Sequence, residues 1–436
     1  MTPRRRFWHI AGAGTAFQAG SAAVDSATVM SALVFQLTGS AVAVGAVSTI
    51  LRLGWLLPQL VVGYLAGRAA SAMPFYIIGA FGRTIAIFLL AGVLWSGATA
   101  GWSHAALGAA TLVLWIMYAG LSGVVGVPYN DIVARSVPSE RRSRVLAIRF
   151  FGGGLVALGV AALADRLVRE LVFPISYAAI LGIAALLMLV SSVVFTMMGE
   201  PKRTVPPKMA DNFGAYLREG VSTFRTDPVF RRFVFSQWCG GAVLVAAPFF
   251  VVAAGSLGVG FENVAMLLGA QTAGALAANP LWGWWGDKLG KLSLMRAIAV
   301  ARAIPPVVVL ALTLSPVPPE ITLSILLAVF FFLGALANGL TIAVIGLLME
   351  ISPDERRASY SGYFNALTAP AFVFPLLGGL AVAAMGAWIV FTIALVLAVV
   401  QATFLFRIEL PGIAPVSRQT TDSRNAGQNH LGKTGR

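Results

Sequence analysis

Long apolar runs separated by short polar intervals make up most of the chain. A helix needs roughly 20 apolar residues to cross the hydrocarbon layer of a bilayer. Twelve runs reach that length, so we predict membrane-spanning helices at residues 9–37, 41–66, 73–96, 105–131, 144–168, 172–197, 230–254, 262–285, 291–314, 320–348, 357–383 and 386–407. The strands of a membrane barrel would instead alternate apolar and polar positions over about ten residues. The pattern therefore predicts an all-α integral membrane protein.

Composition supports the same class of protein. Of the 436 residues, 58% are hydrophobic and only 11% are charged, and the mean hydropathy is +0.84. So little polar surface suits a lipid bilayer and does not suit a soluble globule. The net charge of +14 comes from basic residues dispersed over short loops. Membrane topology explains this charge better than nucleic-acid binding does.

The distribution of lysine and arginine predicts the orientation. Cytoplasmic loops of membrane proteins carry an excess of these residues. If the N-terminus is cytoplasmic, most of the 31 lysines and arginines lie on that side, and the opposite side keeps only Arg166 and Arg169. We therefore expect a multi-pass protein of a bacterial-type inner membrane with both termini in the cytoplasm.

Three pairs of segments recur about half a chain apart, which indicates two related halves. The segment from Gly283 to Lys291 places glycine and charge in a turn between two apolar runs, and residues 63–68 are a weaker version of it. The other pairs are Pro-Ser-Glu-Arg-Arg at 138–142 with Pro-Asp-Glu-Arg-Arg at 353–357, and Arg83 with Arg302. We therefore predict two pseudo-symmetric six-helix bundles.

The longest polar interval divides the halves. Its apolar residues Phe213, Tyr216, Leu217, Val221 and Phe224 recur at helical spacing, which predicts an amphipathic helix on the membrane surface. We divide the chain into an N-terminal six-helix bundle (1–198), a cytoplasmic linker (199–229), a C-terminal six-helix bundle (230–407) and a disordered cytoplasmic tail (408–436). We also predict that Pro370 and Pro375 bend the eleventh span.

Twelve spans in two halves, a central linker and the Gly-x-x-x-Asp-Lys-x-Gly-Lys turn after the eighth span resemble the major facilitator superfamily over nearly the whole chain. The resemblance implies a secondary active transporter whose two bundles rock around a site between them. Its expected partners are the lipid bilayer, a small-molecule solute and protons. We expect a monomer that needs no cofactor.

The resemblance also implies a cytoplasmic gate. In the superfamily, the aspartate of the turn meets the N-terminus of a helix from the opposite half, where a carboxylate is stabilised by the helix dipole. This role falls to Asp287, with the start of the fifth span as its partner, in a gate motif made of Gly283, Asp287, Lys288, Gly290 and Lys291. In the first half Gly67 stands where the aspartate belongs. The segment from Gly63 to Arg68 is therefore either a weaker latch, in which Arg68 pairs with Asp131, or an ordinary solvated turn.

Charged residues inside predicted spans are candidates for function, because an unpaired charge at mid-membrane costs roughly 2.5 to 3.5 kcal/mol. Asp25 in the first span is the candidate for proton coupling, and its alternative role is a permanent ion pair with Arg52 or Arg83. Arg52 suits a carboxylate or phosphate on the solute. The third helix of each bundle is expected at the outside, which favours a structural role for Arg83 and Arg302 near cytoplasmic helix ends.

The remaining candidates for the substrate cavity are Arg149, Gln237, Trp238, Gln271, Asn338 and Asn365. Arg149 could serve the gate or the site. The amides could instead form hydrogen bonds between helices, and the aromatic ring could simply pack.

The chain carries no pattern typical of an enzyme. Its histidines, His9, His104 and His430, lie near span ends or in the tail, which supports no metal site or triad. It also has no phosphate-binding loop of the Walker type. We therefore predict gradient-driven transport of a small polar or anionic solute. The alternatives are a drug or metabolite efflux permease, although the fifth span lacks the Gly-Pro pairing of many drug antiporters, and a non-transporting membrane sensor.

Overall fold

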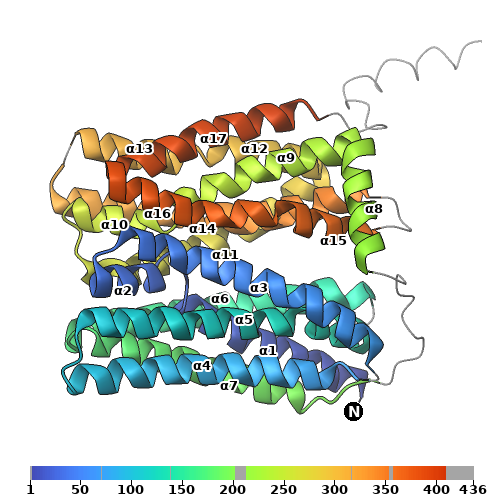
Figure 1. Ribbon diagram of the computed structural model, residues 1–436, viewed down its shortest axis with the longest axis horizontal. Coiled ribbons are helices and arrows are strands. Elements are labelled where there is room, and N and C mark those ends of the chain that lie inside the picture. Colours follow the sequence, from blue (N-terminus) through green and yellow to red (C-terminus); the bar gives the residue numbers. More distant parts are fainter. Residues whose placement is uncertain are drawn as a thin grey trace, which may run out of the picture.

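The computed structural model describes residues 2–69, 71–137, 139–201, 213–315, 317–352 and 357–408. Within these ranges every regular element is a helix. The long helices run side by side in two layers, with the first half of the chain in the lower layer of Figure 1 and the second half in the upper layer. The predicted tail lies outside the described residues beyond Ile408.

The first half consists of seven helices. They are α1 (Pro3–Ala23), α2 (Val29–Thr38), α3 (Ala41–Arg68), α4 (Met73–Thr99), α5 (His104–Ser136), α6 (Ser139–Glu170) and α7 (Ile175–Thr196). Local sequence sets several of these ends. Gly39, at φ 61°, ends α2, and the Ser40 hydroxyl accepts a hydrogen bond from Ala43 N–H at 3.2 Å to begin α3.

The second half begins with α8 (Phe213–Thr226), which is the predicted amphipathic helix. The elements that follow are α9 (Pro228–Val243), η1 (Leu244–Ala246), α10 (Phe249–Ser256), η2 (Phe261–Asn263), α11 (Val264–Lys288), α12 (Lys291–Ala301), α13 (Ile304–Leu314), α14 (Pro319–Ile351), α15 (Arg357–Thr368), η4 (Ala369–Val373), α16 (Phe374–Met385) and α17 (Trp388–Phe406). Helix α8 lies across one end of the molecule, which we call the linker end, and α2 and α10 lie at the opposite end, which we call the far end (Figure 1).

Eleven segments of the described chain are long and apolar enough to cross a membrane, and α2 adds a shorter apolar helix that continues the path of α1. The predicted all-α membrane fold is thereby confirmed, and α1 with α2 makes the twelfth span.

Four spans are interrupted, which the sequence predicted for only one of them. The eleventh span changes from α15 to α16 through the 3₁₀ turn η4, at the predicted Pro370. The first span, predicted as one helix over 9–37, breaks between Ala23 and Val29. The seventh breaks at η1 and the ninth between Ala301 and Ile304. Broken helices inside a membrane occur where the freed backbone groups line a cavity or find protein partners.

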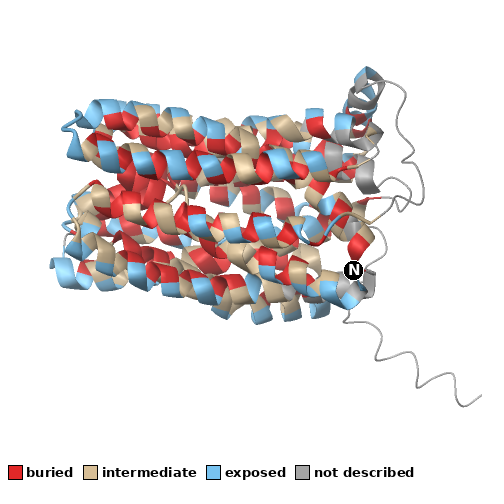
Figure 2. Cartoon of the chain, turned by 90° about the horizontal axis from the view of Figure 1, so that it is seen from below, coloured by how far each residue is buried: buried red, intermediate tan, exposed pale blue. Residues whose placement is uncertain are grey.

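Three groups of buried apolar residues show how the halves meet. The largest group lies toward the far end and combines both halves, with Leu33 of α2 and Val47 of α3 beside Phe249 and Phe250 of α10. The other two lie toward the linker end, and each belongs to one half: the first half contributes residues such as Tyr76, and the second half has its own group. The halves therefore pack together at the far end and separate at the linker end. In Figure 2 the buried residues gather between the long helices, and exposed residues lie on the outer faces and at the ends.

Candidate functional site

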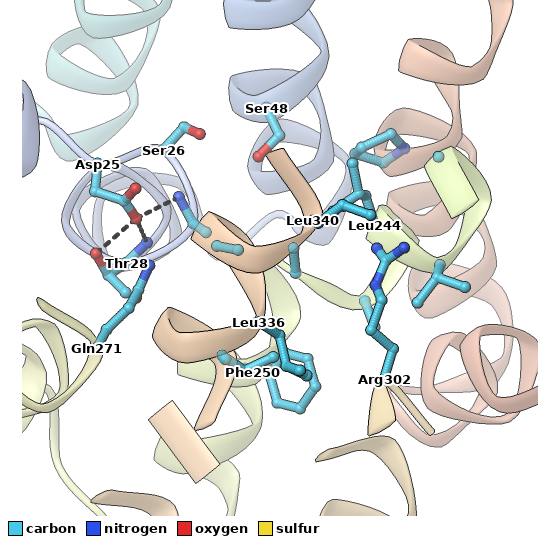
Figure 3. A pocket seen from close by; sticks show the side chains of 18 of the residues that line it. Asp25, Ser26, Thr28, Ser48, Leu244, Phe250, Gln271, Arg302, Leu336 and Leu340 are labelled. Atoms are coloured by element: carbon cyan, nitrogen blue, oxygen red, sulfur yellow. Dashed lines mark hydrogen bonds between the residues drawn. The ribbon is translucent and has the colours of Figure 1, made fainter. Parts of the chain in front are cut away.

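A cavity of about 370 Å³ lies between the two halves. It is lined by α3 and the break in the first span on one side, and by α11, α14 and the breaks of the seventh, ninth and eleventh spans on the other. Three charged side chains line it in the described part of the chain: Asp25, Arg52 and Arg302. Figure 3 shows Asp25 and Arg302 on opposite sides of this space, with Phe250 and Leu336 between them.

Asp25 lies in the break between α1 and α2, and its side chain holds the turn that leads into α2. Its Oδ1 accepts hydrogen bonds from Ala27 N–H at 3.0 Å, from Thr28 N–H at 2.9 Å and from the Thr28 hydroxyl at 2.8 Å (Figure 3). Among the described residues Asp25 forms no ion pair, and Arg52 acts on it only through longer-range electrostatics. The predicted permanent pair with Arg52 or Arg83 is therefore absent in this conformation.

Arg52 and Arg302 enter the cavity from different halves. Arg52 comes from α3, is exposed to the cavity, and has its Cζ 5.8 Å from the centre of the Phe372 ring in η4. Arg302 lies in the break between α12 and α13, is 8% exposed, and donates a 3.3 Å hydrogen bond from Nη1 to Gln401 Oε1. Their positive charges repel each other. We expected Arg302 near a cytoplasmic helix end, but it lies at the break between α12 and α13 and its side chain lines the cavity. Whether its role is structural stays a prediction.

Gln271 and Asn338 are the two predicted amides that line the central cavity. Together with Asp25 they also line an adjoining cavity of about 230 Å³. Asn338 Nδ2 donates to Asn279 Oδ1 at 3.1 Å and to Ala275 O at 3.3 Å, so α14 and α11 are joined beside the cavity.

The other predicted cavity residues lie elsewhere. Gln237 donates to the Ser236 hydroxyl at 3.3 Å, Trp238 Nε1 donates to Leu367 O at 2.8 Å, and Asn365 is exposed. None of these three is part of the cavity lining described above. Arg149 lines a separate cavity inside the first half together with Arg83.

The predicted turn after the eighth span is shorter than the gate motif: Gly283–Lys288 continue α11, Lys291 begins α12, and only Leu289 and Gly290 form the turn. Gly290, at φ 86°, lies between α11 and α12 in the left-handed region that glycine adopts without strain. Asp287 pairs with Lys291 at 2.8 Å and is largely exposed. The side chains at the start of α6 lie outside the described part, so the latch between Asp287 and the fifth span stays a prediction.

The corresponding turn of the first half is described only in its backbone. The burial of Gly63 and Gly67 and the side chain of Arg68 lie outside what the structure describes. Asp131 pairs with Arg135 at 2.7 Å. The pairing of Arg68 with Asp131 stays a prediction.

Sequence reasoning missed two features. The hydroxyl groups of Ser26, Thr28 and Ser48 line the central cavity, and nothing in their spacing distinguishes them from helix-packing residues. The sequence does indicate a helix break near Arg302. Pro305 and Pro306 follow it by three and four residues, and such a pair favours the start of a new helix.

Solved structures share this architecture. A mutant of the nucleoside transporter NupG matches with a TM-score of 0.72 at 13% identity, over 93% of this chain and 100% of that chain. A bacterial homolog of the human lysosomal transporter Spinster matches with a TM-score of 0.68 at 12% identity, over 93% and 97%. A POT family transporter in complex with 5-aminolevulinic acid gives 0.69 at 11% identity, over 93% and 96%. At such identities the likeness shows the fold.

The fold is that of membrane transporters built from two six-helix bundles, and a cavity lies between the two halves. The family model described as Major Facilitator Superfamily matches residues 245–430. This match covers less than half of the chain, and together with the fold likeness it makes the chain similar to members of that superfamily, with no subfamily assigned. No curated protein matches the chain in sequence.

Proposed function

We propose that this protein is a secondary active transporter that moves a small solute with an anionic group across the membrane by alternating access, coupled to protons through Asp25. One observation carries the proposal: Arg52 and Arg302 reach one cavity from opposite halves. A guanidinium forms strong, directed hydrogen bonds with carboxylate and phosphate. An anion bound between the two would connect the halves, so its binding would depend on how the halves are placed.

The lining also indicates the rest of the solute. Phe250, Phe330 and Leu336 form an apolar wall, and Thr28, Gln271 and Asn338 offer hydrogen bonds. A compact molecule with an anionic end and an apolar or weakly polar body fits both parts.

The excess of basic residues supports a bacterial-type inner membrane with the linker end and both termini on the cytoplasmic side. The halves pack together at the far end and separate at the linker end. The structure is then the conformation closed toward the outside and open toward the cytoplasm. The opposite conformation requires the far-end contacts to part and the linker ends to meet.

Asp25 is suited to couple solute and proton movement. Its Oδ1 is occupied by the three hydrogen bonds of the turn before α2, which leaves Oδ2 as the second oxygen of the carboxylate in a cavity that also holds Arg52. Protonation of Asp25 would remove the negative charge beside the two arginines and so strengthen their attraction for an anionic solute. Proton and solute would then bind together.

The test is a solute screen by thermal stabilisation in detergent, followed by uptake of each hit into proteoliposomes. We expect Arg52→Gln to weaken binding of anionic hits and Asp25→Asn to abolish the pH dependence of uptake. Arg166→Gln is the matched control, because Arg166 is exposed and pairs with Glu170 away from the cavity. Binding and uptake of every hit at wild-type levels by both cavity variants would refute this site. Binding without flux in wild-type protein would favour the sensor, and hits confined to cationic or neutral drugs would favour the efflux permease.

A further inference from the structure

A second cavity lies entirely within the first half. It has a volume of about 170 Å³ and is lined by residues of α1, α3, α4, α5, α6 and α7. A water molecule occupies about 30 Å³ of liquid, so the space could hold a small group of waters or a compact ion. Among the described residues its lining includes two arginines, Arg83 of α4 and Arg149 of α6, and no carboxylate.

Arg83 is buried without a polar partner. Its side chain is 4% exposed, and its Nε is fully buried without a hydrogen bond. The guanidinium makes no hydrogen bond or ion pair in the described part of the chain. Its neighbour is the Phe17 ring, whose centre lies 4.0 Å from the Arg83 Cζ. A cation–π contact of this kind does not satisfy the five N–H donors of the group.

Arg149 faces the same Phe17 ring, and it too has a buried guanidinium nitrogen without a hydrogen-bond partner among the described residues. Its Cζ is 5.6 Å from the centre of Phe17 and 5.4 Å from that of Tyr129, and its Nη1 lies 3.2 Å from the Tyr129 hydroxyl. The Nε of Arg149 is buried and has no partner. The two guanidinium charges repel each other.

The approach of Arg149 is built into the packing. A Cβ at Gly14 of α1 would lie 2.7 Å from the Arg149 Cγ and 2.8 Å from its Cδ. Glycine at this position therefore leaves room for the stem of Arg149 to lie against α1.

These observations require a compensating group. Arginine stays protonated in proteins, so the pair cannot relieve its repulsion by losing a proton. Water in the cavity could accept hydrogen bonds but would leave two like charges in a medium of low dielectric constant. An oxyanion supplies both acceptors and opposite charge. We propose that this cavity is a binding site for a compact oxyanion, held by Arg83 and Arg149 and separate from the central cavity.

The site is tested by binding, without a transport assay, so its outcome does not depend on the proposed function. Purified full-length protein in detergent is titrated with sodium sulfate or sodium acetate against sodium chloride at constant ionic strength, and binding is followed by calorimetry and thermal melting. We expect saturable binding of at least one oxyanion, weakened at least tenfold in Arg83→Gln and in Arg149→Gln. Binding of acetate without sulfate would indicate a site for a carboxylate, and binding of sulfate without acetate would indicate a site for a tetrahedral anion.

Three controls keep the result decisive. Arg166→Gln must respond like wild type, because sulfate also stabilises proteins by exclusion from their surface. Arg52→Gln removes oxyanion binding that depends on the central cavity, so saturable binding that persists in this variant belongs to the second cavity. Gly14→Ala retains both charges and should weaken binding by displacing Arg149, which covers the case in which Arg83→Gln fails to fold.

Selenate diffused into crystals should give an anomalous peak between the two arginines. Loss of binding in Arg52→Gln with retention in Arg149→Gln and Gly14→Ala, or no saturable binding of either oxyanion, would overturn the proposal.

Discussion

The Thr49 hydroxyl accepts a 3.1 Å hydrogen bond from the backbone N–H of Leu376, which joins α3 of the first half to α16 of the second. Two glycines bring the same helices together. A Cβ at Gly379 would lie 2.5 Å from the Ala41 carbonyl oxygen, and one at Gly45 would overlap the carbonyl of Pro375. Since the obstacles are backbone atoms, a side chain at either position would force the helices apart. The far end therefore closes by direct backbone contact between the halves.

Substitution Gly379→Val should prevent this closure. We expect the population to shift toward the conformation that is open at the far end, and transport to fall strongly while the protein still folds. Spin labels placed on α3 and α16 near the far end would report a longer distance than in wild type. Gly92→Val is the matched control, because a Cβ at Gly92 meets nothing within 4 Å. An unchanged label distance in Gly379→Val would contradict the role of this contact.

Substitution Arg302→Gln should weaken binding of an anionic solute. A hydrogen bond to a charged group contributes roughly 1.5 to 3 kcal/mol, which corresponds to a loss of about 10- to 100-fold in affinity. Arg302→Lys should recover part of the loss, because lysine keeps the charge without the planar fork. The measurement is a dissociation constant for a hit of the solute screen. Equal affinity in Arg302→Gln and wild type would limit Arg302 to its contact with Gln401.

The architecture was predictable because lipid imposes it on the sequence. Each span must satisfy its own backbone groups, so span length, repeat pairs and the distribution of basic residues are visible in the chain. Caps are equally local: Asp227 stands directly before Pro228, the first residue of α9, and its Oδ1 accepts hydrogen bonds from Val229 N–H at 3.0 Å and Phe230 N–H at 2.9 Å. Gly290 was recognisable as part of the turn after the eighth span.

Residues of the site were predictable only where a charged side chain stood inside an apolar span. Asp25 and Arg52 stood out as charges inside spans, and both line the central cavity. Arg302 stood out as well, but its location depends on a helix break that carries it inward. Whether Trp238 and Asn365 face the cavity depends on how each helix is rotated about its own axis. A membrane helix is apolar on all sides, so the sequence does not indicate this rotation.

The two roles of Asp25 can be separated by substitution. Asparagine keeps a side-chain oxygen that can accept the hydrogen bonds of Ala27 and Thr28, so Asp25→Asn should melt at nearly the temperature of wild type. Alanine removes these hydrogen bonds and should cost about 1 kcal/mol of stability. If Asp25 carries the proton, solute exchange without a gradient survives in Asp25→Asn, whereas accumulation driven by a proton gradient is lost. Accumulation at the wild-type level in Asp25→Asn would show that Asp25 serves only to hold the turn before α2.

Glu200 at the linker end ties three segments of the first half together. Its carboxylate accepts hydrogen bonds from the Ser71 hydroxyl, from Ala72 N–H at 3.0 Å and Met73 N–H at 2.9 Å at the start of α4, and from Arg135 at the end of α5. Burial alone would raise the pKa of Glu200, but these donors lower it from 4.5 to about 2. The positive end of the α4 dipole acts in the same direction.

The lowered pKa of Glu200 gives its contribution to stability a defined pH range. The contribution is complete above pH 4.5, the pKa of the unfolded chain, and disappears as the pH falls toward about 2, where the folded carboxylate takes up its proton. Glu200→Gln should therefore lower the melting temperature at pH 7 and flatten its fall below pH 4.5. Thermal melting in detergent across this range measures both effects. Glu170→Gln is the control, because Glu170 also pairs with an arginine but is largely exposed, and exposed pairs contribute little. Parallel melting curves for wild type and Glu200→Gln over the whole range would show that this carboxylate does not hold the segments together.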